Sequence, residues 1–468
     1  MSEQQYVGAF PAKRFFVEML TRDIELIDAI LDLIDNCLDG AIRTIGKAHL
    51  EDETPYKGFY TEITLNENSF TIKDNCGGIS REIAQKSAFR MGRPADDIDK
   101  DLPTVGVYGI GMKRAIFKLG SQSDIITKTD NDSFSVSIKK EWLESDEDWN
   151  LPISTPPIRE LESNGTEITI EELKPGIARL FSNENDFIND LMNSVSSYYS
   201  FIIEKGFVVK INDTIIKPNI NKLVIDPSFL DKDEAMAPYL YENTIDGVKV
   251  KLSVGFYRGF TTDSEEDELN SGKATTERAG WTVICNDRIV LFGDKSRKTG
   301  WGEAGVAQYH TQFIAISGVV IFESTDPSKL PLTTTKRGIE GNSDLYLTVK
   351  EYMREGLKIF TSFTNKWKKY RQESEKSALQ IPTTTKTSKE IYNEFPSDKW
   401  STIRKSTGGK VFRPNLPIPR TNDPTRQIRY SKKITDIETV SEFLFGDRDR
   451  SPNEVGERCF DYIIQEIE

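Results

Sequence analysis

A glycine-rich segment that opens a helix is the first part of this chain that could do chemistry. Residues 105–113 read Val-Gly-Val-Tyr-Gly-Ile-Gly-Met-Lys. Glycines let a backbone approach an anion closely and aim its N–H groups at phosphate oxygens, and Lys113 adds a point charge. The predicted phosphate-contacting residues are Gly106, Gly109, Gly111, Met112 and Lys113. Because such a turn is also a common structural device, the other motifs of the chain are needed to decide whether this one binds phosphate.

A helix predicted over residues 22–43 carries an acidic stripe. Apolar residues at helical spacing predict a core-facing side: Leu26, Ile30, Leu33, Ile34, Leu38 and Ile42. On the other side, Asp28, Asp32, Asn36 and Asp39 recur at spacings of four, four and three residues. A solvated face is one reading of this stripe, although like charges at this spacing repel one another.

No lysine or arginine lies between Asp23 and Arg43 to relieve that repulsion. A bound divalent cation would relieve it, because Asn36 offers a hard carbonyl ligand. A carboxylate one turn away could orient an attacking water molecule.

A turn rich in glycine follows a short predicted strand at residues 69–73. Asp74 begins this turn, and Gly77, Gly78 and Ile79 continue it. One reading is a tight Asx turn. The functional reading is that a buried Asp74 accepts the exocyclic amine of adenine while Gly78 makes room for the ring. Thr166, in a strand predicted over residues 165–170, could support that contact directly or through water.

In chain order, the helix with Asn36, the Asp74 turn, the glycine-rich lid at residues 105–113 and the Thr166 strand resemble the GHKL ATPase superfamily. That superfamily includes DNA gyrase B, MutL, heat-shock ATPase chaperones, sensor histidine kinases and MORC proteins. The resemblance spans residues 15–175. It implies that Asn36 binds Mg²⁺, that Asp74 reads adenine and that ATP lies under a lid. The residues it matches to adenine and phosphate contacts are Gly78, Ile79, Gly106, Gly109, Gly111, Met112, Lys113 and Thr166.

Two residues depart from the family pattern. Asp32 stands where hydrolysing members carry a glutamate that acts as general base, and Cys76 replaces the first glycine of the Asp74 turn. A side chain shorter by one methylene places the base less well, so slow ATP hydrolysis is expected.

The resemblance extends into a second block of sequence. Residues 280–290 and 310–313 alternate like strands, and a loop at residues 330–339 precedes a helix predicted over 343–372. The block is similar to the transducer domain of gyrase B, MutL and MORC, in which a loop lysine reaches the γ-phosphate. Lys336 matches that lysine and is assigned a catalytic role. A solvated basic loop is the alternative.

Two observations narrow the choice within the superfamily. The only histidines are His49 and His310, and both are read as polar structural residues, so phosphotransfer to histidine is a poor interpretation. The lid also lacks the Gly-Phe-Arg-Gly-Glu-Ala pattern of MutL. Its form is closer to that of MORC and related bacterial ATP-binding proteins.

Composition agrees with a folded intracellular protein. The chain has 468 residues, of which 37% are hydrophobic, enough for two or three domains with their own cores. We find neither a signal-peptide layout at the first residues nor an apolar run long enough to span a membrane. Four cysteines without metal spacing indicate reduced thiols, hence a cytoplasmic location.

The net charge of −13 hides a basic stretch. Residues 399–433 carry ten Lys or Arg and a single acid, Asp423, among several prolines, which predicts an extended segment. Trp400, Phe412 and Tyr430 alternate with the cations, a composition suited to nucleic acid. A basic linker along an acidic protein surface is equally compatible.

We therefore predict an α+β chain of four parts. A Bergerat-type ATP-binding domain, a mixed sheet with helices on one face, occupies residues 1–235. An S5-like transducer domain occupies 236–375, a basic linker 376–434 and a helical tail 435–468.

The family implies an ATP-gated homodimeric clamp, with an arm at residues 6–14 crossing to the partner subunit. Its expected client is nucleic acid, in genome maintenance or prokaryotic defence. The alternative client is a protein partner, which the tail would bind.

Overall fold

The computed structural model describes most of the chain. The described residues are 12–50, 52–90, 92, 102–106, 109–145, 149–182, 186–258, 278–333, 337–368, 383–403, 408–418 and 430–467. The chain forms two compact units, Met1–Pro419 and Arg420–Glu468. The first unit contains two large sheets, and each unit is described by itself below.

The first sheet has eight strands in the order β5-β4-β3-β6-β2-β1-β7-β8. Its neighbours pair antiparallel, except for the parallel pair β1 and β7. The central pairing of β2 with β6 brings the turn after β2 beside the start of β6. The strands are β1 Tyr60–Leu65, β2 Phe70–Asp74, β3 Gly120–Lys128, β4 Ser133–Ile138, β5 Ile153–Ser154, β6 Gly165–Leu173, β7 Val208–Ile211 and β8 Thr214–Ile215.

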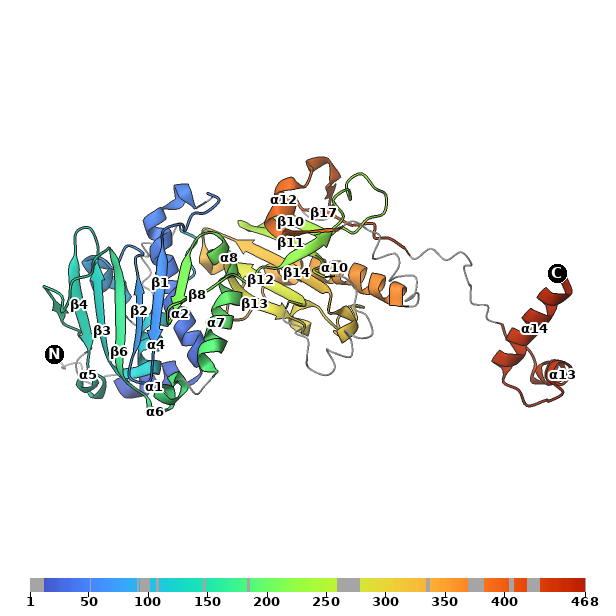
Figure 1. The fold of residues 1–468 in the computed structure, drawn as a ribbon, viewed down its shortest axis with the longest axis horizontal. Coiled ribbons are helices and arrows are strands. Elements are labelled where there is room, and N and C mark those ends of the chain that lie inside the picture. The colour runs from blue at the N-terminus through green and yellow to red at the C-terminus, as the bar shows by residue number, and fades with distance from the viewer. Residues whose placement is uncertain are drawn as a thin grey trace, which may run out of the picture. The chain divides into compact units, whose positions relative to one another are not determined.

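Helices cover one face of this sheet (Figure 1). The longest of them, α2, buries Ile30, Ile34 and Leu38 completely, as its helical spacing predicts. The helices are α1 Lys13–Arg22, α2 Leu26–Ile45, α3 Arg81–Ile83, α4 Gly111–Leu119, α5 Lys140–Glu144, α6 Pro175–Phe181, α7 Phe187–Tyr198 and α8 Ser200–Glu204. A 3-10 turn, Lys47–His49, and a π-helical turn, Ala84–Ala88, complete the set.

The second sheet has seven strands in the order β13-β12-β14-β11-β10-β17-β16. Helix α10 (Asp344–Lys368) packs on it, and a pair formed by β9 and β15 lies with helix α12 (Ser388–Glu394). The strands are β9 Lys222–Ile225, β10 Tyr239–Ile245, β11 Val248–Phe256, β12 Gly280–Cys285, β13 Arg288–Asp294, β14 Ile316–Glu323, β15 Thr384–Thr387, β16 Ser401–Thr402 and β17 Lys410–Phe412.

The two sheets are joined by an apolar contact. Below, the first sheet with its helices is called the first domain, and the second sheet with α10 and α12 the second domain. Ile284, Ile289 and Ile321, which line the face of the second sheet away from α10, pack with Tyr198 and Phe201 of the first domain. The sheet is therefore covered on one face by α10 and on the other by the α7–α8 region.

Two predicted features differ in the structure. Residues 311–313 form a 3-10 turn instead of a strand, because the His310 ring accepts the Gln312 N–H and caps that turn. The stretch 399–433 is assigned to a linker by the sequence, but β16 and β17 within it, which are extended as predicted, join the second sheet.

The basic stretch joins the sheet because Trp400 and Phe412, two of the side chains predicted to stack on bases, pack inside the protein. Phe412 lies with its ring centre 4.8 Å from that of Phe395, and Trp400 lies 5.1 Å from the same ring. They form a small core with Phe229 and Leu223, so burial of apolar surface holds the segment on the fold. Residues 404–407 and 419–429 lie outside the described residues.

The second unit contains two helices, α13 (Ile434–Phe445) and α14 (Pro452–Ile467), as predicted for the tail. Large apolar side chains remain exposed on both, including Phe443, Phe460 and Ile467. Within the described residues, no helix is long and apolar enough to cross a membrane.

Candidate functional site

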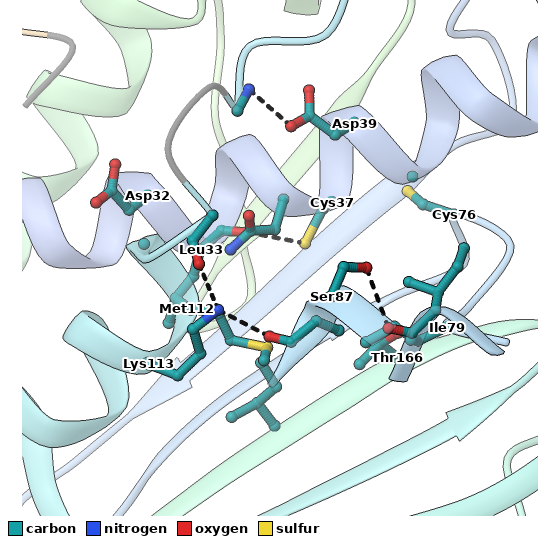
Figure 2. A pocket seen from close by; sticks show the side chains of 18 of the residues that line it. Asp32, Leu33, Cys37, Asp39, Cys76, Ile79, Ser87, Met112, Lys113 and Thr166 are labelled. Atoms are coloured by element: carbon teal, nitrogen blue, oxygen red, sulfur yellow. Dashed lines mark hydrogen bonds between the residues drawn. The ribbon is translucent and has the colours of Figure 1, made fainter. Parts of the chain in front are cut away.

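A pocket of about 190 Å³ lies between helix α2, the turn after β2, the start of β6 and the start of α4. The four sequence motifs meet there, although they lie far apart in the chain. Figure 2 shows Asp32, Cys37 and Asp39 projecting from α2, with Met112 and Lys113 from α4. The predicted residues that line it are Asp32, Asn36, Asp74, Gly78, Ile79, Gly106, Gly109, Gly111, Met112, Lys113 and Thr166.

Asp74 lies at one end of the pocket as a buried carboxyl group. Its Oδ1 accepts the backbone N–H of Cys76 at 2.8 Å and that of Thr166 at 3.3 Å. Burial raises the pKa of Asp74 to about 6, although these amides and the thiols of Cys37 and Cys76 oppose that shift. Both backbone amides converge on Oδ1 and Asp74 lines the pocket, so a ligand donor such as an exocyclic amine would take Oδ2.

We expect adenosine binding to weaken below about pH 6, because protonated Asp74 loses acceptor capacity. If only the ionised form binds, affinity falls about tenfold per pH unit. Calorimetry with adenosine from about pH 8 to about pH 5 measures this without a titrating phosphate. Constant affinity over that range would contradict the assignment. From this group alone, folding stability is greatest below pH 3.8 and is lost as the pH rises through about 6.

Backbone packing explains the glycine at position 78. A Cβ atom there would lie 2.1 Å from the carbonyl oxygen of Lys128, and the residue has a φ of +74°. Gly78 is therefore required by the neighbouring strand, whatever it also allows in the pocket.

Thr127 ties the Ile79 and Thr166 motifs together, and the sequence motifs did not reveal it. Its hydroxyl accepts the Ile79 N–H at 2.7 Å and lies 3.4 Å from the Thr166 hydroxyl. The hydroxyl of Thr166 is thus held by a polar neighbour at the pocket wall. Only the pairing of β3 with β6 brings Thr127 to this place.

Cys76 fits where the family has a glycine because the residue packed against it, Gly40 of α2, has no side chain. A Cβ atom added to Gly40 of α2 would lie 2.8 Å from the Cys76 carbonyl oxygen and 3.1 Å from the Cys76 Cβ. Any larger residue at position 40 would clash with this turn. The missing side chain on the helix thus compensates for the added one in the turn.

The acidic residues of α2 have partners within the protein itself. Asp28 pairs with Arg337, Asp32 with Arg114, and Asp35 with Arg288, while Asp39 accepts two backbone amides. The repulsion that suggested a cation is therefore relieved by arginines distant in sequence. Asn36, between Asp32 and Asp39, is exposed within the pocket.

The beginning of the lid differs from its predicted arrangement. The N–H groups of Val105 and Gly106 donate to Asp39, at 2.6 and 2.8 Å, so in this structure they are not directed at a phosphate. Val107 and Tyr108 lie outside the described residues.

Lys113 also differs from its assigned role. Its ammonium donates to the carbonyl oxygens of Ala88, at 2.8 Å, and Gly109, at 2.5 Å (Figure 2). Burial lowers its pKa to about 8. The ammonium thus fastens the lid to the π-helical turn instead of standing free for a phosphate.

Among the described residues, ion pairs join the second domain to helix α2 at two points. Lys336 lies outside the described residues, but its neighbour Arg337 pairs with Asp28. Arg288, at the start of β13, donates to Asp35 at 2.8 Å, and both side chains are 1% exposed. These two arginines carry the contact between the second domain and the helix that lines the pocket.

Residues 24–172 match a protein-family model described as histidine kinase-, DNA gyrase B-, and HSP90-like ATPase. No curated protein matches the chain. The matched residues contain α2, the Asp74 turn, the lid and the start of β6, which together form the pocket. The match therefore supports a GHKL-type ATPase domain, and with it ATP binding, in this part of the chain.

Proposed function

We propose that this protein is a slow ATPase in which ATP occupies the pocket between α2 and α4. The observation that carries the proposal is the position of Asp74, a buried carboxylate whose Oδ2 accepts neither backbone amide, in the pocket that the glycines of the lid also line. The family match supports the same reaction.

Asn36 is the proposed Mg²⁺ ligand. Mg²⁺ keeps several water molecules and takes one or two protein oxygens together with substrate phosphates. A single exposed amide oxygen facing the pocket fits that requirement. Bound Mg²⁺ would neutralise phosphate charge.

Asp32 is the proposed general base, and its surroundings support slow turnover. Its Oδ2 accepts Arg114 Nη2 at 2.5 Å, and both side chains are buried. A guanidinium beside a carboxylate favours the charged form and weakens it as a proton acceptor. Hydrolysis then needs this pair to separate or turn.

We expect Asp32→Asn to bind ATP and to lose hydrolysis, since the amide keeps the shape but accepts no proton. Phosphate release under saturating ATP measures the loss, and calorimetry checks binding. Asp124→Asn, a carboxyl on β3 bonded to Ser137 outside the pocket, serves as the matched control. A variant at Asp32 with normal turnover would remove this residue from the mechanism.

The proposed working state is a dimeric clamp with a MORC-like lid. Lys336, as part of an S5-like transducer domain, would reach the γ-phosphate in the closed dimer, and the arginine contacts with α2 would transmit closure. Sedimentation with and without a non-hydrolysable ATP analogue tests the clamp. A chain that stays monomeric with the analogue would refute it.

We propose two alternative clients, nucleic acid and a protein partner. The +9 charge of residues 399–433 favours nucleic acid and is the support for a role in genome maintenance or defence. The exposed apolar side chains of α13 and α14 favour a protein partner. Salt-sensitive binding of DNA or RNA would select the first, and nuclease-resistant co-purification of one defined protein would select the second.

A further inference from the structure

Arg114 is a buried cation in the pocket wall that no sequence motif identified. Its side chain is 9% exposed, and Nη2 donates to Asp32 at 2.5 Å. Its Nε atom is buried without a hydrogen-bond partner among the described residues. Because a guanidinium has five N–H donors in a fixed fork, Arg114 retains donor capacity that the protein has not used.

The other cations that line the pocket are differently placed. Lys113 is bonded to two backbone carbonyl groups. Arg43 is exposed and lies on α2 near its end, beyond Gly40. Among the described lining residues, Arg114 is therefore the buried cation beside the proposed base.

The two ends of the pocket can be assigned from helix α2. Gly40 packs against Cys76, next to Asp74, and Asp32 packs against Gly111 at the start of α4. Eight residues of helix separate these contacts, which is about 12 Å. If adenine lies at Asp74, the phosphates extend toward Asp32, and the terminal phosphate comes nearest to Arg114.

We propose that Arg114 distinguishes ATP from ADP by exchanging its Asp32 partner for the γ-phosphate. This inference rests on the proposed function. With ADP bound, the terminal phosphate is absent and the guanidinium stays on Asp32. With ATP bound, the guanidinium donates to a γ-phosphate oxygen, and Asp32 is released.

The exchange would tie activation of the base to the presence of its substrate. A phosphate carries more charge than a carboxylate and accepts charge-assisted hydrogen bonds in a bidentate geometry from arginine. Asp32, once released, regains the proton affinity that its ion pair suppresses. No covalent bond changes in this step.

The test compares the affinities of the full chain for ADP and for the β,γ-imido analogue of ATP, with Mg²⁺. We expect Arg114→Gln to lower the affinity for the analogue by about ten- to a hundredfold, the range of a charged hydrogen bond, and to leave ADP binding nearly unchanged. Asp32→Asn should raise the affinity for the analogue, because the guanidinium no longer has to leave a carboxylate.

Two controls separate this role from a structural one. Asp32→Asn/Arg114→Gln removes both charges, so it leaves no unpaired buried ion, and it should still lose the preference for the analogue. Lys118→Gln removes a cation from the same helix, one that donates to Thr21 outside the pocket, and should keep the preference.

The outcomes separate the two proposals. A wild-type chain that binds neither nucleotide overturns the proposed function and this inference with it. A wild-type chain that binds both, together with Arg114 variants that keep its preference for the analogue, overturns this inference alone.

Discussion

Replacing Asp74 by asparagine is expected to abolish measurable binding of adenine nucleotides. Oδ1 of Asp74 accepts the Cys76 and Thr166 amides, so an asparagine would place its own oxygen there. Its NH₂ group would then take the place of Oδ2 and face the amine of adenine, donor against donor. A buried mispaired donor costs about 1–3 kcal/mol, which is about 5- to 150-fold in affinity, and two are created here.

Calorimetry with ADP measures this loss, because ADP binding does not depend on hydrolysis. Asp124→Asn makes the same chemical change on β3 of the same sheet, outside the pocket, and should leave the affinity unchanged. The melting temperature of both variants checks the fold. Unchanged ADP affinity in Asp74→Asn would remove adenine from this end of the pocket.

Replacing Arg288 by methionine is expected to destabilise the protein by about 3–5 kcal/mol, the usual cost of breaking a buried ion pair. Arg288 and Asp35 are both 1% exposed, and the guanidinium also lies 4.2 Å from the ring centre of Tyr199. Without it, the Asp35 carboxylate keeps the Tyr199 hydroxyl as a donor and loses its opposite charge.

Urea unfolding followed by tryptophan fluorescence measures this change, and the first transition is compared because two domains need not unfold together. The double variant Asp35→Leu/Arg288→Met should recover most of the stability, since both charges are absent. Arg14→Met breaks an exposed pair with Glu18 and should not shift the transition. If the single variant Arg288→Met were as stable as the wild type, the ion pair between Arg288 and Asp35 would not stabilise the contact between the two domains.

The position of the pocket could be predicted from the sequence because its motifs depend on local rules. Helical spacing identified the apolar and polar sides of α2, and Asp74 with two glycines indicated the turn after β2. The predicted helix began at residue 22, whereas α2 begins at Leu26, because Arg22 ends the preceding helix α1.

The ion pairs of α2 could not be predicted in this way. Arg114, Arg288 and Arg337 lie 82, 253 and 309 residues from their aspartates, and no spacing rule connects positions so far apart. An acidic stripe read without its partners therefore suggested a metal ion. Only the tertiary fold shows that arginines pair with two members of the stripe, Asp28 and Asp32, and a third with the neighbouring Asp35.

The aromatic residues of the basic stretch illustrate a different limit. Trp400 and Phe412 have the composition expected for stacking on bases, and the same composition suits packing on Phe395. Sequence reports which side chains are present, but the choice between an internal and an external partner depends on whether a core lies within reach.

The number of residues in the turn between β12 and β13 is constrained by contacts with the first domain. Asn286 and Asp287 both have positive φ values, and Asp287 accepts Lys205 and Tyr56 of the first domain. Arg288 follows this turn directly, so one inserted residue would displace Arg288 along the strand and away from Asp35. An insertion that other hairpins tolerate would therefore break the ion pair between Arg288 and Asp35 that joins the two domains. We expect natural length variation to avoid this turn.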